Sequence, residues 1–189
     1  YDEDAHTGRL VDRVRQLGFN SVGAFSGGSD VFSQKSFPRV GTLPLGAYTL
    51  GAAVPGVRGV FDPYDAKNLA KMEELFSKSV AEKAGDPLLI GYFLDNEQGF
   101  EDLPRAIPAL PGKHACKREL VALLRETYNK DIAAFNAAWN LDAASFDALA
   151  DRGLPLTTKA AFNDMQAYTE RFLDTYYSVI TKTFRKYDK

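Results

Sequence analysis

Residues 88–97 read Leu-Leu-Ile-Gly-Tyr-Phe-Leu-Asp-Asn-Glu, a nearly continuous apolar run that ends in three polar residues. An apolar run of this length is typical of a strand buried on both faces, as in a parallel sheet covered by helices. The polar end, Asp95-Asn96-Glu97, follows the strand directly. In α/β sheets and barrels, binding and catalytic side chains gather at the carboxyl ends of the strands. The stretch therefore predicts an α/β fold with a functional site after residue 94.

The segments before this strand alternate between helical and extended patterns. Residues 7–18 have apolar residues at helical spacing and end at Gly18, and residues 19–25 predict a short strand. Residues 43–50 predict a second strand, with Pro44 near its start, where a missing N–H is tolerated. A loop is expected over residues 51–62 and a helix over residues 64–84. This alternation predicts parallel strands.

The rest of the chain is predicted to be mostly helical. Three prolines in residues 98–112 predict a loop. Helices are expected over residues 113–128, 130–139, 145–150 and 158–187, the last with a wide apolar face. The sequence contains no internal repeat and no linker that would divide the chain. We therefore expect residues 1–189 to form a single domain, in which residues 98–187 are mostly helical.

Composition excludes several classes of protein. The 23 Lys and Arg residues are scattered and the formal net charge is −2, so the chain is not expected to bind nucleic acid. No run approaches the roughly 18 apolar residues of a membrane span, and no membrane association is expected. The single cysteine excludes an intramolecular disulfide. It does not decide the compartment, so secreted, periplasmic and cytoplasmic locations all stay open.

Glu97 is the candidate catalytic residue. Glycoside hydrolysis needs a carboxylic acid to protonate the leaving oxygen, together with a second carboxylate as nucleophile or base. A glutamate beside an apolar strand end is expected to be partly desolvated, which favours its protonated form. The asparagine before it would hydrogen-bond a sugar hydroxyl. For an arbitrary Asp-Asn-Glu sequence a structural role at the loop is the better interpretation; the preceding strand shifts the balance towards catalysis.

Residues 89–97 resemble the fourth barrel strand of clan A glycoside hydrolases, in particular family 42 β-galactosidases and family 50 β-agarases, in which such a strand ends in Asn-Glu. Three other stretches resemble these families in the same order. Residues 15–23 are similar to strand two of these enzymes and the helix before it. Residues 60–64, with the helix up to Pro87, are similar to the approach to strand four. Residues 134–140, Ala-Phe-Asn-Ala-Ala-Trp-Asn, are similar to the helical excursion after it.

The resemblance implies a partial (β/α)8 barrel that covers strands two to four, with a helical insertion after the fourth strand. A complete barrel usually needs about 250 residues, and only three strands are predicted here. The resemblance also implies a retaining mechanism on a β-linked galactoside or polysaccharide, with Glu97 as general acid/base and no metal or organic cofactor. The nucleophile of these families follows a later strand that this sequence lacks. The rest of the barrel is therefore expected on another chain or outside this sequence.

Candidate substrate contacts surround the predicted strand ends. A Gly-Gly turn follows the first predicted strand, and its polar residues either line a sugar pocket or form an ordinary turn. Two strand tyrosines either stack on a sugar ring or are buried by alternation. The aspartate before the Asn-Glu pair either orients its neighbours or makes a structural hydrogen bond. These candidates are Ser26, Asp30, Tyr48, Tyr92, Asp95 and Asn96.

Two functions of other classes stay open. One is a non-catalytic carbohydrate-binding fragment that keeps the acid side of a cleft. The other is an unrelated α/β domain in which residues 95–97 cap a strand and the helical half binds a protein. Glycan binding without hydrolysis would favour the first alternative. Burial of the Asn-Glu pair away from any cleft would favour the second.

Overall fold

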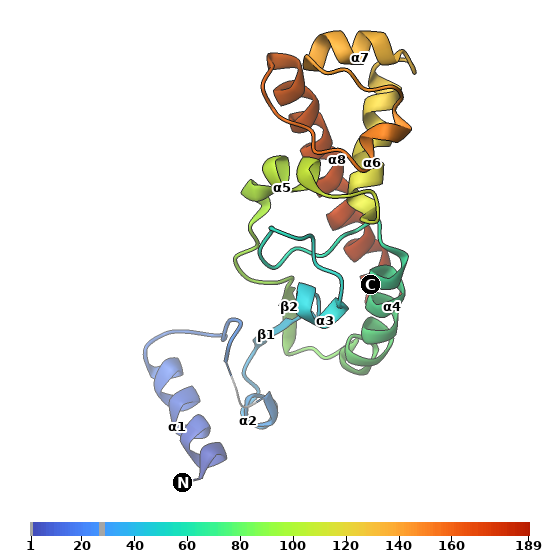
Figure 1. Ribbon diagram of the computed structural model, residues 1–189. Helices are drawn as coiled ribbons and strands as arrows, with labels where there is room; N and C mark the ends of the chain where they lie inside the picture. Colours follow the sequence, from blue (N-terminus) through green and yellow to red (C-terminus); the bar gives the residue numbers. More distant parts are fainter. Residues whose placement is uncertain (1, 27–28) are drawn as a thin grey trace.

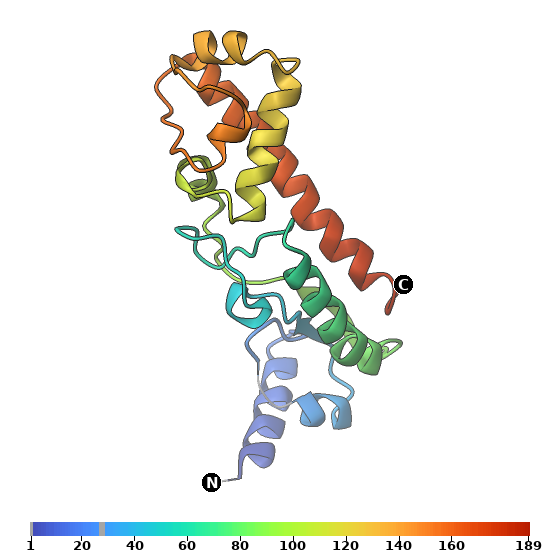
Figure 2. The same cartoon turned by 45° about the vertical axis from the view of Figure 1, so that its right-hand side comes forward.

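A computed structural model describes residues 2–26 and 29–189, with only the backbone considered at residues 29, 47 and 48. The described chain is elongated (Figure 1). Helices α1 (Glu3–Gln16) and α2 (Ser29–Gln34) lie at one end, and a two-stranded sheet lies in the middle. The long helix α8 (Lys159–Phe184) runs from the far end back to the sheet, as Figure 2 shows.

The sheet confirms the predicted parallel α/β arrangement for two strands. Strand β1 (Arg39–Thr42) pairs in parallel with β2 (Leu89–Phe93), and β2 matches the strand predicted over residues 88–94. The strand predicted over residues 19–25 is reduced to one parallel bridge between Val22 and Arg39. Val22 accepts a hydrogen bond from Val40 N–H at 3.0 Å and donates to the Pro38 carbonyl. Residues 19–25 therefore join the sheet at one position only, and the strand predicted there is too long.

The strand predicted over residues 43–50 is wrong. Its first half is a turn, because Pro44 has no N–H for a ladder and Leu45 N–H bonds back to the Leu43 carbonyl. Its second half is the short helix α3 (Ala47–Leu50). The alternating leucines that indicated a strand are indeed buried. They point into the core from a turn that follows β1 rather than from a strand.

Strand β2 is not buried on both faces, contrary to the prediction. Ile90 is 58% exposed and Phe93 is 44% exposed, on opposite faces of the strand. Within the described residues β2 pairs only with β1, so one of its edges is open. An apolar run predicts burial of both faces, and within the described residues the two faces of β2 are covered only in part.

The helix predicted over residues 64–84 is confirmed as α4 (Ala66–Ser79) followed by the 3-10 helix η1 (Ala81–Lys83). Asp65 caps its N-terminus by accepting from Lys67 N–H at 2.8 Å. The predicted loop over residues 98–112 is partly wrong. It contains the 3-10 helix η2 (Phe100–Asp102) and helix α5 (Leu103–Ala109). Helix α5 accommodates two of the three prolines of this segment, because Pro104 lies in its first turn and Pro108 in its last turn.

The remaining helices confirm the sequence pattern. They are α6 (Ala115–Thr127), α7 (Ile132–Trp139), the 3-10 helix η3 (Asp147–Leu149) and α8. Asp131 caps α7 and Thr158 caps α8, both with side-chain oxygens that accept from helix N–H groups. Asn140 ends α7 in the left-handed conformation, with φ of 54°. These local signals explain why the helical half was easier to predict than the sheet.

The apolar stripe of α8 forms the spine of the main core, as its helical spacing predicts. Its buried positions include Met165, Tyr168, Phe172, Tyr176 and Ile180. A second, smaller core holds α1 against α2, through Val11, Phe32 and Phe37. Among the described residues no helix is long and apolar enough to cross a membrane.

Two buried polar side chains fix residues 52–62 to the helices around them. Asn68 of α4 bonds both backbone groups of Ala52 and the Asp62 carbonyl. Asp62, itself 4% exposed, accepts from Tyr64 N–H at 3.0 Å and from Cys116 N–H, in the first turn of α6, at 2.8 Å. Burial, reinforced by the Asp62 charge, raises the pKa of the Cys116 thiol. This segment, which leads towards the candidate site, is therefore anchored to both α4 and α6.

Lys117 on α6 is a buried cation that holds two loop carbonyls. It is completely inaccessible to solvent, and its ammonium donates to the Pro108 carbonyl at 2.6 Å and to the Arg152 carbonyl at 2.9 Å. Burial penalises the charged form and lowers the pKa of Lys117 to about 8. The side chain thus joins the end of α5 to the segment after η3.

This depressed pKa predicts that stability rises between about pH 8 and pH 10.5. Below that window Lys117 is protonated in both states, so folding carries the full cost of burying its charge. Within it the unfolded chain still binds the proton and the folded chain does not, so the free energy of unfolding rises with pH. Compared with Lys117→Met by urea unfolding, the wild type should gain at most about 3 kcal/mol over this range. A pH-independent difference between the two proteins would contradict it.

Candidate functional site

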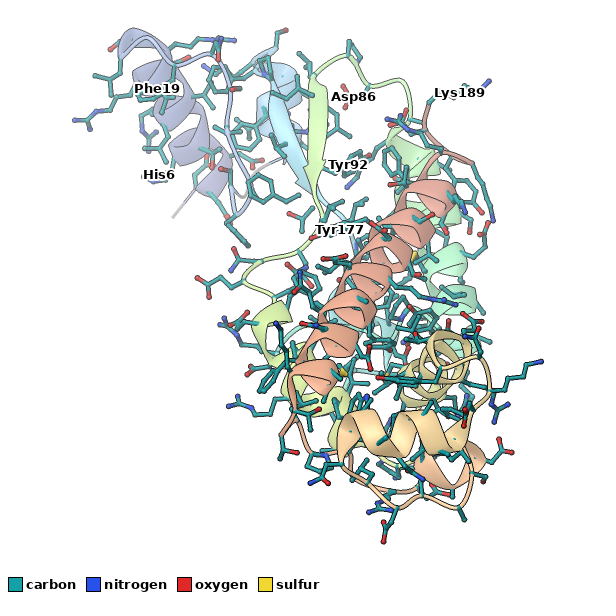
Figure 3. All side chains as sticks on the ribbon, turned by 90° about the horizontal axis from the view of Figure 1, so that it is seen from above. His6, Phe19, Asp86, Tyr92, Tyr177 and Lys189 are labelled. Carbon is teal, nitrogen blue, oxygen red and sulfur yellow. The ribbon has the colours of Figure 1, made fainter. Side chains whose placement is uncertain are left out.

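Asp95-Asn96-Glu97 lies where the sequence predicts, at the carboxyl end of β2. The segment leaves the strand beside α8 and continues to η2 and α5. Figure 3 shows Asp86 near the start of β2, with Tyr92 and then Tyr177 lying between the strand and α8 further along. Glu97 has φ of 53°, a left-handed conformation that is uncommon for a residue other than glycine. A strained residue next to a strand end is typical of functional segments.

Glu97 is more exposed than expected. Its side chain is 69% exposed, and one carboxylate oxygen lies 3.2 Å from a guanidinium nitrogen of Arg58, itself mostly exposed. The backbone of Arg58 is fixed, because its carbonyl accepts from Gly99 N–H at 2.8 Å. The partial desolvation predicted for Glu97 is therefore not found within these residues. An exposed pair of this kind holds the carboxylate only weakly.

Asp95 is directed inward, whereas Asn96 and Glu97 are exposed. One carboxylate oxygen accepts from Asn96 N–H at 2.7 Å. The other, Oδ2, is buried and has no hydrogen-bond partner among the described residues. It lies against Gly46, since a Cβ placed there would be 3.7 Å from it. Asn96 itself is exposed and its side chain is free to reach a ligand.

Tyr176 of α8 packs against the ring of Phe100, three residues after this segment. Burial raises the pKa of its hydroxyl, and the negative charge of nearby Asp95 raises it further, while the side chain of Gln98 acts in the opposite direction. Gln98 approaches the hydroxyl without forming a well-aligned hydrogen bond. Sequence reasoning places this residue only in the apolar stripe of α8, and no sequence pattern singles out Arg58.

Ser26 and Asp30 are exposed and line a hollow of about 350 Å³ between the N-terminal segment and β1, together with Arg39 and Leu89. This hollow is separate from residues 95–97. The two regions approach each other at Phe25, whose ring lies 6.4 Å from that of Phe93. The Gly-Gly pair of the predicted turn, residues 27–28, and the side chain of Tyr48 lie outside the described residues.

Tyr92 lies on the side of β2 that faces α8. Its ring packs edge-on against Phe184 at 5.3 Å, and burial raises the pKa of its hydroxyl. It lines a groove of about 420 Å³ between β2 and the end of α8, with Ile90, Phe184 and Asp188 also in its wall. The structure therefore places Tyr92 in helix–strand packing, away from residues 95–97.

The described residues contain no group of three His, Cys, Asp or Glu side chains arranged to hold a metal ion. The site consists instead of an exposed carboxylate, an exposed amide and an inward carboxylate on one short segment. Such a set can exchange a proton with a ligand and hydrogen-bond its hydroxyl groups.

The comparisons with known proteins identify the fold. No family model and no curated protein matches the chain. Among solved structures, it is similar to an exo-β-agarase, with a TM-score of 0.76 and 21% identity over 95% of this chain. It is also similar to an agarase named AgWH50C (TM-score 0.75, 21% identity, 94% of this chain) and to a protein named PfGH50B (TM-score 0.72, 20% identity, 94%).

These matches confirm the α/β fold and the predicted likeness to agarases, at an identity that establishes the fold alone. The chain spans about a quarter of the length of the matched structures, 26% of the exo-β-agarase and 27% of the other two.

Proposed function

We propose that this chain forms the acid/base side of the active site of a retaining glycoside hydrolase that acts on a β-linked galactoside or galactan. The observation that carries the proposal is the position of Glu97, at the carboxyl end of β2 in a chain whose fold is similar to agarases over 95% of its length. Binding and catalytic residues of α/β barrels lie at this end of the strands.

Each residue of the segment receives a role from its environment. Glu97, exposed and in a left-handed conformation, protonates the glycosidic oxygen and then removes a proton from the attacking water. Asn96, also exposed, binds a sugar hydroxyl beside the scissile bond. Asp95 turns inward and fixes the backbone of Asn96. Tyr92 is assigned to packing, because its ring lies against Phe184.

The second carboxylate of the reaction belongs to strands outside these residues. A retaining mechanism places it about 5–5.5 Å from Glu97. We propose that the chain is the part of a (β/α)8 barrel that holds strands two to four, with residues 98–187 as a helical insertion. The open edge of β2 fits such an arrangement, because a further parallel strand would pair with its free backbone groups. The rest of the barrel would also partly desolvate Glu97, which favours the protonated form that a general acid requires.

The substrate class rests on the likeness to agarases, which favours an agar-type galactan over a small β-galactoside. The deciding experiment assays the complete enzyme that contains this chain on agarose, agarose-derived oligosaccharides and aryl β-galactosides, with product anomers followed by NMR. We expect hydrolysis with retention on the galactan. Binding of these oligosaccharides without any hydrolysis would instead support a carbohydrate-binding module, and inversion would exclude the retaining mechanism.

A further inference from the structure

Arg58 is carried by a tight loop between α3 and α4. Residues 53–61 fold back on themselves, and the loop is closed by a hydrogen bond from Val54 N–H to the Val60 carbonyl at 2.9 Å. Val57 and Val60, which flank Arg58, are buried in the main core. The side chain of Arg58, in contrast, is 67% exposed. The core thus fixes the backbone of the loop and leaves the guanidinium group in solvent.

This loop lies directly against the segment that carries Glu97. Gly99 N–H donates to the Arg58 carbonyl at 2.8 Å. A Cβ at Gly99 would lie only 3.3 Å from the Arg58 amide nitrogen and 3.4 Å from the Arg58 Cβ, so a glycine allows the two backbones to touch. Figure 1 shows the segment between α3 and α4 beside the one that leads from β2 to α5. Because Gly99 follows Glu97 by two residues, the contact fixes the start of the Arg58 side chain beside the candidate acid.

The guanidinium group of Arg58 is directed at the carboxylate of Glu97. Its Nη1 atom lies 3.2 Å from Glu97 Oε2, and this is the one ion pair that Arg58 makes among the described residues. A guanidinium has five N–H donors in a planar fork, so most of them stay available. An exposed ion pair contributes little free energy. A ligand that reaches Glu97 can therefore take up these donors at small cost.

The chemistry proposed for Glu97 indicates which ligand group the donors would meet. Sugars offer hydroxyl and ring oxygens as acceptors, and hydrogen bonds from a charged donor are stronger than neutral ones. The acid protonates the glycosidic oxygen, and this oxygen departs with the leaving sugar. The other sugar becomes attached to the second carboxylate, which the proposed function assigns to strands outside these residues. Arg58 therefore lies on the side of the bond where the leaving sugar is held.

We propose that Arg58 binds the leaving sugar of an agar-type galactan, through hydrogen bonds from its guanidinium group to oxygens of that sugar. The inference rests on the proposed function, because it requires Glu97 to face the glycosidic bond. It makes the loop of residues 53–61 a specificity-determining part of the site. A substrate whose leaving group has no sugar oxygens gains nothing from Arg58.

The first test is steady-state kinetics of the complete enzyme with Arg58→Met, which keeps an unbranched side chain and removes the donors. We expect kcat/KM on agarose-derived oligosaccharides to fall roughly ten- to a hundredfold, the effect of losing hydrogen bonds from a charged group. On an aryl β-galactoside kcat/KM should stay at the wild-type value. The matched control is Arg105→Met, which removes an exposed guanidinium of α5 that pairs with Asp102 and should affect neither substrate. Equal losses on the two substrates, or no loss on the oligosaccharide, would overturn the proposal.

The second test measures binding without turnover, and so separates a sugar contact from an effect on the acid. In the complete enzyme that carries Glu97→Gln, addition of Arg58→Met should raise the Kd for an agarose-derived oligosaccharide roughly ten- to a hundredfold in calorimetric titration. An unchanged Kd would mean that Arg58 acts only through Glu97, and would overturn the contact with the sugar. A complete enzyme that neither binds nor hydrolyses the oligosaccharide would overturn the proposed function together with this inference. One that hydrolyses it, with Arg58→Met at the wild-type Kd and kcat/KM, would overturn this inference alone.

Discussion

Glu97→Gln in the complete enzyme is expected to lower kcat/KM on agarose oligosaccharides by roughly a hundred- to ten-thousandfold, the usual contribution of general acid catalysis. Glutamine keeps the size of the side chain but cannot protonate the leaving oxygen. For an aryl β-galactoside with an acidic phenol, departure needs no protonation, so kcat/KM should be largely spared. The ratio of the two losses, measured by steady-state kinetics, is the signature of the acid role.

A matched control is Glu101→Gln, which changes an exposed glutamate four residues further along, in η2. It should leave kinetics on both substrates unchanged. Equal losses on the oligosaccharide and the aryl galactoside in Glu97→Gln would contradict the acid role and point to a general structural defect. Unchanged hydrolysis of the oligosaccharide would remove Glu97 from the mechanism altogether.

Local chemistry explains what the sequence predicted well. The helices α6, α7 and α8 have side-chain caps or apolar stripes that operate within one element, so their positions follow from the sequence to within a few residues. Strand β2 was identified by its apolar run, and residues 95–97 were identified as a candidate site because they directly follow that run. The family-like order of segments agrees with the match to agarase structures over 95% of the chain.

The predictions that were wrong concern features that depend on residues distant in the sequence. Residues 39–42 become β1 because β2 and Val22 lie beside them, and the residues themselves carry no clear strand pattern. Residues 43–50 have that pattern but form a turn and α3, since Pro44 cannot join a ladder. The exposure of Glu97 and the burial of Tyr176 against Phe100 depend on how elements distant in the sequence pack, which periodicity within one element does not describe.

The second large effect is expected on stability, from removal of the buried carboxylate of Asp62. Asp62→Ala is expected to lower the free energy of unfolding by about 3 kcal/mol, because it leaves two N–H groups, of Tyr64 and Cys116, without their charged acceptor in a buried place. The residue lies in the segment that also carries Arg58, between α4 and α6. Its loss should therefore loosen the link between the sheet and the helical half.

Urea denaturation of Asp62→Ala, Asp62→Asn and Asp65→Ala separates this effect from ordinary helix capping. Asp65 also accepts from a backbone N–H, but it caps α4 at the surface, so its removal should cost about 1 kcal/mol. Asp62→Asn retains an acceptor oxygen in the same place and should fall between the two. A loss in Asp62→Ala no larger than in Asp65→Ala would mean that α6 does not depend on Asp62. The sheet and the helical half would then be held together by other contacts, among them the apolar face of α8 and the contacts of Lys186 and Tyr187 with Glu73.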